Sequence, residues 1–175
     1  MLPRSTHTRS NREASRGKQG GRTLEIQRLI GRSLRSIINL KILGERQIII
    51  DCDVIQADGG TRTASITGGW IALSLAVNKL LHTNKIKSDP VINQICAISC
   101  GVWNGFPVLD LDYSEDSNAE IDSNFVLAAD RKLVEVQISS ESDPFKKSTM
   151  DELLNLAFKG AEKIFEKQLK AVNDT

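Results

Sequence analysis

The chain has 175 residues and a net charge of +1, with 40% hydrophobic and 26% charged residues. These values are ordinary for a globular protein, and the length allows one domain with a sizeable buried core. They exclude a disulfide-stabilised miniprotein and a disordered chain. No stretch looks long and apolar enough to span a membrane, and no signal peptide is visible. We therefore expect a cytoplasmic protein without a membrane partner.

The three cysteines show no pattern of metal ligands. Cys52, Cys96 and Cys100 lie in or beside apolar runs, and they lack paired metal-ligand spacing with His7 or His82. We expect all three to be buried, reduced thiols.

Charge is distributed unevenly along the chain. Residues 1–46 carry eleven Lys and Arg against three acidic residues, a balance of +8, whereas residues 47–175 have a balance of −7. A basic N-terminal part is typical of a protein that binds a polyanion such as RNA. The alternative is a solvated arm followed by an ordinary charged helix face, and charge alone favours this alternative.

The first half of the chain predicts an arm, a helix, a strand and a second helix. Residues 1–21 show no hydrophobic periodicity and are rich in Arg, Ser and Gly, which indicates a loop. Residues 23–43 predict a helix, and a continuous apolar run within residues 47–56 predicts a strand buried on both faces. Residues 63–82 predict a second helix. One side of the first helix carries basic residues for RNA, for another subunit or for solvent: Arg28, Arg32 and Arg35.

The second half predicts strands followed by one long helix. Asn104-Gly105 is a strong hairpin turn between strands within residues 91–102 and 108–113. Residues 123–129 and 132–138 predict a second hairpin. A capping box from Thr149 to Glu152 predicts the start of a final helix that ends near residue 172. The order indicates an α+β fold with a mixed β-sheet and packed helices.

One stretch combines a turn, a cation and a helix start. Gly59 and Gly60 allow close approach of a ligand to the main chain, and the helix that follows presents free N–H groups to an anion. Arg62 adds a planar set of donors that suits phosphate oxygens. This pattern predicts a phosphate site. An ordinary strand-to-helix turn capped by Thr61 or Thr63 is an equal alternative on local chemistry.

Residues 110–122 contain six acidic residues. Asp110 and Asp112 would share one face of a strand, while Asp116 and Asp122 bracket the loop to the next strand. Clustered carboxylates repel one another unless a cation neutralises them, and Mg²⁺ is usually held by one or two carboxylates plus phosphate oxygens. Together with the phosphate site, this segment predicts metal-assisted phosphoryl transfer. The alternative is an exposed acidic loop.

Long ungapped strings in this chain resemble bacterial ribonuclease PH. They occupy residues 1–9, 16–32, 51–67 and 112–122, and they include Gly-Gly-Arg-Thr at 20–23 and Gly-Thr-Arg at 60–62. The likeness covers nearly the whole chain. It implies one ribonuclease PH-like domain over residues 1–175, related to ribosomal protein S5 domain 2, with a basic arm at 1–22 and a globular core at 23–172.

The resemblance implies a phosphorolytic 3′-to-5′ exoribonuclease that trims tRNA precursors and other RNA 3′ ends, with inorganic phosphate as co-substrate and Mg²⁺ (or Mn²⁺) as cofactor. Nucleoside diphosphates would be released by a cytoplasmic homohexamer built as a trimer of dimers. Three groups of residues carry the implied roles: phosphate binding by Arg22, Gly60, Thr61 and Arg62; catalysis and metal binding by Asp116 and Asp122; RNA binding and assembly by Arg4, Arg9 and Arg12.

Two departures from the family pattern leave alternatives. Family members carry a segment before the Met-Leu-Pro string at residues 1–3, so we expect the chain to be N-terminally truncated relative to them. The family's Gly-Thr-Ala-Glu-Gly is replaced by Ile-Ser-Ser-Glu-Ser at residues 138–142. The alternative functions are a catalytically silent RNA-binding or ring subunit and a chain that does not fold alone. One of the two aspartates would serve as a general acid if it does not hold a metal.

Overall fold

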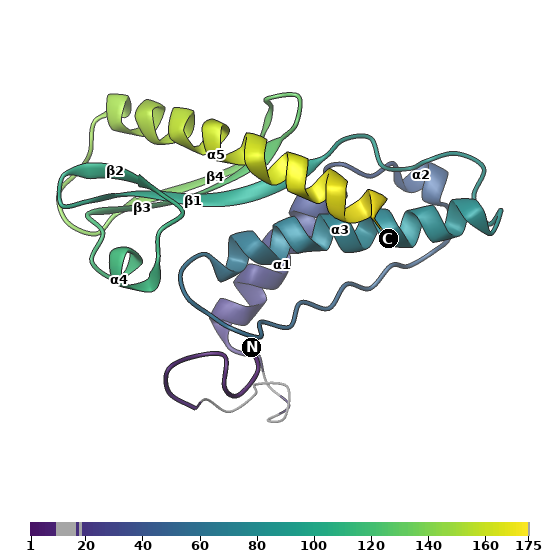
Figure 1. Cartoon of the computed structure of the whole chain (residues 1–175), viewed down its shortest axis with the longest axis horizontal. Helices are drawn as coiled ribbons and strands as arrows, with labels where there is room; N and C mark the ends of the chain where they lie inside the picture. Colours follow the sequence, from purple (N-terminus) through teal and green to yellow (C-terminus); the bar gives the residue numbers. More distant parts are fainter. Residues whose placement is uncertain (10–16, 18, 175) are drawn as a thin grey trace.

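An antiparallel sheet with helices on both faces is the framework of the structure (Figure 1). The computed structural model describes residues 1–9, 17 and 19–174. Four strands in the described residues pair in the order β2-β1-β3-β4, and every neighbouring pair is antiparallel. The elements along the chain are α1 (Gly21–Arg35), α2 (Leu40–Leu43), α3 (Thr61–His82), β1 (Ile95–Trp103), β2 (Phe106–Leu109), α4 (Tyr113–Asp116), β3 (Ile121–Ala128), β4 (Leu133–Ser140) and α5 (Lys147–Asn173).

The sheet separates two apolar layers because side chains alternate along each strand. One cluster joins α5 to Cys96, Ile98 and Phe125 of the sheet. The other joins α1 and α3 to the opposite face, through Ala97 and Val126. The sheet and the three long helices therefore form a helix–sheet–helix arrangement, which is the α+β fold expected from the sequence.

A buried glutamine joins the elements of the core. Gln168 in α5 is only 1% exposed. Its Nε2 donates to the carbonyl oxygens of Thr67 in α3 at 2.9 Å and Ile95 in β1 at 3.0 Å. Its Oε1 accepts from Gln94 at 2.9 Å. One polar side chain thus fixes the C-terminal half of α5 against α3, where Figure 1 shows the two helices meeting.

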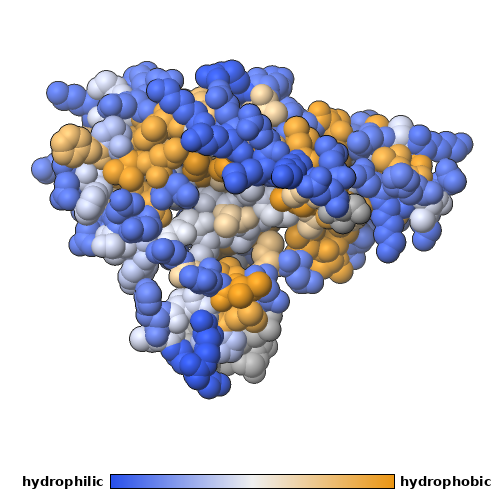
Figure 2. All heavy atoms as spheres, in the orientation of Figure 1, coloured by the Kyte–Doolittle hydropathy of each residue, from blue (hydrophilic) through white to orange (hydrophobic). Residues whose placement is uncertain are grey.

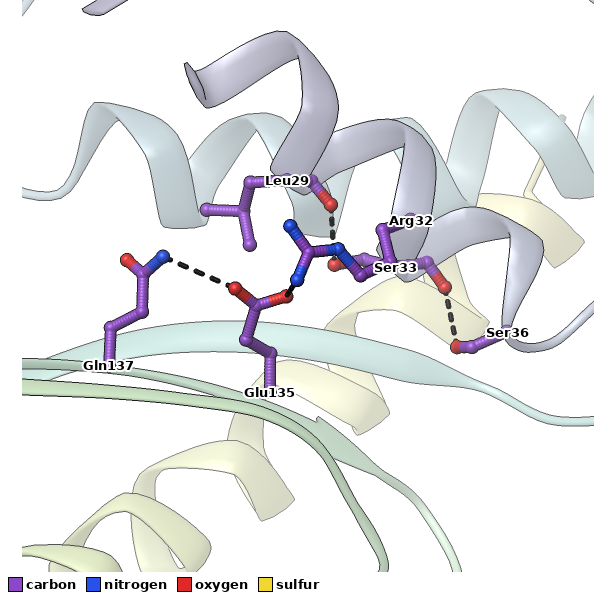
Figure 3. Close-up of polar contacts among 6 residues, drawn as sticks. All are labelled: Leu29, Arg32, Ser33, Ser36, Glu135 and Gln137. Carbon is purple, nitrogen blue, oxygen red and sulfur yellow. Dashed lines mark hydrogen bonds and ion pairs between the residues drawn. The ribbon is translucent and has the colours of Figure 1, made fainter.

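The first helix is shorter than the sequence predicts. It ends at Arg35, and a separate short helix α2 begins after Asn39, whose side chain accepts the N–H groups of its first turn. Between the two, Ile38 forms an isolated bridge with Val91, and the hydroxyl of Ser36 donates to the carbonyl of Ser33 at 2.7 Å (Figure 3). The helix ends there because a distant segment pairs with the backbone: the amide of Ile92 donates to the carbonyl of Ile37, and the carbonyl of Pro90 accepts the amide of Asn39.

The predicted strand at residues 47–56 does not form. A strand needs a neighbour for its N–H and C=O groups, and no strand runs beside this segment in the described part of the chain. Ile48 and Ile50 pack against the core, but Ile49 is 75% exposed. Burial on both faces was therefore the wrong prediction. The segment instead runs as an irregular chain past α3 (Figure 1).

The capping box predicted for the last helix is also absent. Helix α5 begins at Lys147 after Lys146, which makes no side-chain capping bond, so Thr149 already lies inside the helix. A capping box occurs instead at α4, between Asp112 and Glu115. Asp112 consequently does not share a strand face with Asp110, because β2 ends at Leu109.

Two further expectations from composition need correction. Cys52 is exposed, whereas Cys96 and Cys100 are the buried free thiols. Helix α3 is long and apolar enough to cross a membrane by length and composition, contrary to the expectation from the sequence. Its Trp70 and Val77 are buried in the protein, and a core helix of a folded domain has the same composition.

Candidate active site

The site begins where the sheet extends beyond the start of α3. Under that helix the sheet face is apolar, with Ala97 and Val126. Farther along the same strands the face becomes polar, because Ser99 pairs with Asn124 and Gly101 pairs with Asp122. A polar part of the sheet therefore lies next to the N-terminus of α3, where the helix dipole favours an anion.

The glycine turn opens α3 as the phosphate prediction requires. Gly60 is the N-cap residue with φ 67° and ψ 24°, a left-handed conformation that favours glycine. Thr63 donates its hydroxyl to the Gly60 carbonyl at 2.7 Å and makes the start of the helix rigid. Thr61 and Arg62 occupy the first turn, whose N–H groups have no partners within the helix.

Arg62 lies largely buried beside α1. Its side chain is 21% exposed, and its Nη1 lies 3.4 Å from Oε1 of Glu25. Arg22 stands exposed in the first turn of α1, one helical turn before Glu25. The helix beginning at Gly21 therefore removes Arg22 from the arm in which the sequence placed it, and puts it on an element that contacts α3.

An ion pair fixes α1 on the sheet (Figure 3). Nη1 of Arg32 lies 3.2 Å from Oε2 of Glu135 in β4, whose side chain is 12% exposed. Gln137 donates to the other carboxylate oxygen of Glu135 at 3.2 Å. Of the basic side of α1, Arg32 thus has a structural partner, while Arg28 and Arg35 are exposed.

The acidic residues approach from two elements. Asp116 ends the short helix α4, and Asp122 lies in β3. Burial raises the pKa of Asp122, the Asp116 carboxylate raises it further, and the Arg62 guanidinium lowers it. Asp122 lies opposite Gly101 on the polar part of the sheet, and α4 is bonded through the Tyr113 N–H to Asp58, directly before the glycine turn. The structure thereby brings together the phosphate and acidic parts that the sequence predicted separately.

The donor set suits a hard cation held mainly by substrate. The described residues contain no group of three or more His, Cys, Asp or Glu side chains that could hold a metal ion. Mg²⁺ usually needs only one or two carboxylates beside phosphate oxygens and water. Oδ1 of Asp122 is buried without a hydrogen-bond partner among the described residues, so this carboxylate has an unsatisfied acceptor. The pair Asp116 and Asp122 fits Mg²⁺ on that ground.

The N-terminal arm leads to the same region. The amide of Leu2 donates to the carbonyl of Val54 at 3.0 Å, and the amide of Ala57 donates to the carbonyl of Ser5 at 2.6 Å. Arg4 and Arg9 are exposed, and Arg12 lies outside the described residues. Figure 2 shows apolar surface in the lower lobe, near the N-terminus marked in Figure 1.

Two residues near the site were missed by sequence reasoning. Glu25 pairs with Arg62, and Asp58 joins the glycine turn to the start of α4. Both contacts link segments far apart in the chain. The only local signal was the position of Asp58 directly before Gly59, where Asp often organises a turn.

Comparison with protein families identifies the chain. The family model described as "3′ exoribonuclease family, domain 1" matches residues 1–78 of the chain. The model described as "3′ exoribonuclease family, domain 2" matches residues 93–160. The chain belongs to this family. It is 59% identical to ribonuclease PH of Caulobacter vibrioides over 172 residues, which cover 98% of the chain and 72% of that relative. It is 56% identical to ribonuclease PH of Roseobacter denitrificans over 171 residues, with the same two coverages.

Solved structures agree with the fold. Rice Rrp46 has a TM-score of 0.68 at 18% identity, over 90% of this chain and 68% of that one. An exosome of Archaeoglobus fulgidus, with RNA bound to its active site, has a TM-score of 0.64 at 18% identity, over 86% of this chain and 63% of that one. The ribonuclease PH family and its α+β fold, both predicted from the sequence, are confirmed, as is the enzyme class of phosphorolytic 3′ exoribonucleases.

Proposed function

We propose that this chain trims the 3′ ends of tRNA precursors and other RNAs by phosphorolysis, with inorganic phosphate as the attacking co-substrate. The observation that carries the proposal is the junction of the glycine turn before Arg62 with helix α4, which ends at Asp116, beside the polar part of β3 that holds Asp122. A cationic phosphate site beside two carboxylates is the arrangement that phosphoryl transfer between two phosphate groups requires.

The protein's part in this reaction is positioning and neutralisation of charge. A phosphate oxygen forms a bond to the phosphorus of the terminal phosphodiester, the bond to the preceding 3′ oxygen breaks, and a nucleoside diphosphate leaves. Arg22, Arg62 and the N–H groups from Gly60 and Thr61 hold the attacking phosphate, so its encounter with RNA becomes effectively intramolecular. No side chain has to act as the nucleophile.

The two aspartates hold Mg²⁺ or Mn²⁺ in this proposal. A bound divalent cation supplies charge stabilisation at the scissile phosphate and the leaving oxygen. Burial and the Asp116 carboxylate raise the pKa of Asp122, so a bound cation would favour the ionised form of Asp122. If turnover needs no divalent ion, the protonated carboxyl of Asp122 is the donor to the leaving 3′ oxygen. A titration of the rate with MgCl₂ after chelation distinguishes the two roles.

RNA binding and assembly belong to the basic arm in the same proposal. Arg4 and Arg9 are exposed on a segment attached next to the glycine turn, and Arg12 follows them in the sequence. We assign these three residues to tRNA contact and to assembly of a cytoplasmic homohexamer, a trimer of dimers of a single domain spanning residues 1–175. Light scattering tests the assembly, because a hexamer has six times the 19.3 kDa mass of the chain.

The decisive experiment uses the purified chain and a tRNA with extra 3′ nucleotides, with Mg²⁺, in the presence and absence of phosphate. Nucleoside diphosphates that appear only with phosphate are the expected product. Arg62→Ala should abolish turnover while tRNA binding survives. Arg131→Ala is the matched control. Arg131 lies in the turn between β3 and β4, where its Nη1 is 3.6 Å from Oε1 of Glu162 on the surface.

Two results would contradict the proposal. Folded wild-type protein that binds tRNA without a phosphate-dependent product would leave the silent RNA-binding subunit as the function. Loss of tRNA binding in Arg62→Ala, with normal turnover of the RNA that still binds, would remove Arg62 from the phosphate site.

A further inference from the structure

One carboxylate oxygen connects the two halves of the candidate active site. Oδ1 of Asp58 accepts the backbone N–H of Gly59 at 3.1 Å and that of Tyr113 at 2.7 Å. Tyr113 is the first residue of α4, so its N–H is one of the groups that the helix itself leaves unpaired. The bond therefore caps α4 from a segment 55 positions earlier in the chain.

The two connected loops carry different parts of the chemistry. Asp58 lies directly before Gly59 and Gly60, which lead into the phosphate-binding turn of α3. Tyr113 opens the single-turn helix that ends with Asp116. The position of the Asp116 carboxylate relative to a phosphate at α3 is therefore set where these loops meet.

The contact between the loops is close and leaves little freedom. A Cβ atom on Gly59 would lie 1.8 Å from the carbonyl oxygen of Leu111, so the two backbones touch directly. Helix α4 is rigid within itself, because Asp112 accepts the N–H of Glu115 at 2.8 Å and Glu115 accepts the N–H of Asp112 at 3.0 Å. Asp58 supplies the side-chain hydrogen bond that ties this rigid unit to the glycine turn.

We infer that Asp58 is a positioning residue that holds Asp116 at its working distance from phosphate bound at the N-terminus of α3. The inference rests on the proposed function, since it assigns Asp58 a part in the same reaction. Positioning Asp116 in this way requires an acceptor oxygen at the end of a side chain as long as that of Asp58. It does not require the negative charge of the carboxylate. Asparagine should therefore replace Asp58, whereas alanine should not.

The kinetic test compares three variants in the phosphorolysis assay. Asp58→Ala should lower kcat, by up to the order of 10²-fold that a misplacement of about 1 Å costs. Its KM for phosphate should stay within about twofold of wild type, because Arg62 and the N–H groups of α3 remain in place. Asp58→Asn should restore kcat. The matched control is Asp89→Ala, which removes a carboxylate that accepts the N–H of Val91 at 2.8 Å in a surface loop elsewhere.

A second measurement needs no activity. Tyr113 is the only tyrosine in the chain, so protein labelled with ¹⁵N-tyrosine gives one amide resonance, from the N–H that Asp58 accepts. We expect this amide to be protected from hydrogen exchange in wild type and in Asp58→Asn, and to lose protection and shift in Asp58→Ala. Asp89→Ala should leave it unchanged.

The outcomes separate failure of this inference from failure of the proposed function. A wild-type chain without phosphorolysis contradicts the proposed function. The exchange rate of the Tyr113 amide then still tests whether Asp58 holds α4 through this hydrogen bond. If the wild type is active and the Asp58→Ala variant has the same kcat, the positioning role of Asp58 is overturned. A Tyr113 amide in the wild type that exchanges as fast as in an unfolded peptide overturns it as well, even if Asp58→Ala fails to fold. A kcat lost equally in Asp58→Asn and Asp58→Ala would show that the charge, not the hydrogen bond, matters.

Discussion

Replacing Gly59 by alanine tests how closely the two halves of the site must pack. The added Cβ would lie 1.8 Å from the Leu111 carbonyl oxygen and 3.0 Å from the carbonyl carbon of Asp112, whereas ordinary van der Waals contact begins at 3.4 Å. Both neighbours are backbone atoms that no rotamer change can move. The loops must separate by about 1.6 Å, the difference between 3.4 and 1.8 Å.

A separation of this size has two expected consequences. Overpacking of a tight contact costs about 1–3 kcal/mol, so the free energy of unfolding should fall by that amount in urea titrations. Movement of Asp116 away from the phosphate turn should lower kcat by the order of 10²-fold, measured as nucleoside diphosphate release from tRNA.

The matched control is a glycine nearby in sequence that has open space around it. Gly68 lies in α3, and a Cβ built there meets nothing within 4 Å. Gly68→Ala should raise the free energy of unfolding by up to about 1 kcal/mol, because alanine favours a helix interior, and should leave kcat unchanged. A Gly59→Ala protein with wild-type kcat and the wild-type urea midpoint would refute the packing argument.

Three further predictions concern stability and thiol access. The folded-state pKa of Asp122 is raised above its usual 3.8, so the stabilising contribution of its protonated form is full below pH 3.8 and is lost as pH rises through the folded value. Asp122→Asn should therefore unfold at higher urea than wild type at pH 7 and equally near pH 3.5; no difference at pH 7 would contradict this. Burial raises the pKa of the Cys96 and Cys100 thiols to about 12, so a thiol reagent at pH 8 should label Cys52 alone until the protein unfolds, and prompt labelling of all three would contradict the burial. Gln168→Leu leaves two buried carbonyl oxygens without their donor and should lower the free energy of unfolding by at least about 2 kcal/mol; a change below 0.5 kcal/mol, roughly the surface-mutation level, would show that water replaces the amide.

Elements fixed by local chemistry were predicted well. The turn Asn104-Gly105 joins β1 and β2 with φ values of 50° and 76°, which are the positive angles that a tight hairpin requires. Helix α3 extends over Thr61–His82 and α5 over Lys147–Asn173, close to the predicted spans. Their apolar periodicity is repeated over many turns, so no single residue decides the assignment.

Boundaries that depend on distant partners were predicted poorly. Helix α1 stops early because Ile38 pairs with Val91, a segment more than fifty residues later. The apolar run around Ile49 looked like a strand, but a strand exists only with a neighbour to bond, and β-propensity alone cannot supply one. The pattern from Thr149 to Glu152 predicted a capping box, but α5 already begins at Lys147, so Thr149 lies inside the helix.

The sequence by itself determined which groups this protein can bring to a reaction. The glycine turn with Arg62, the carboxylates at Asp116 and Asp122, and the basic arm are properties of residue type and spacing, and the long strings that contain them resemble ribonuclease PH. Only the tertiary structure decided how these parts meet. The bond from Asp58 to Tyr113 and the pair of Glu25 with Arg62 join residues 55 and 37 positions apart. Such contacts depend on how the helices and the sheet pack, and local propensity carries no information about distances through space.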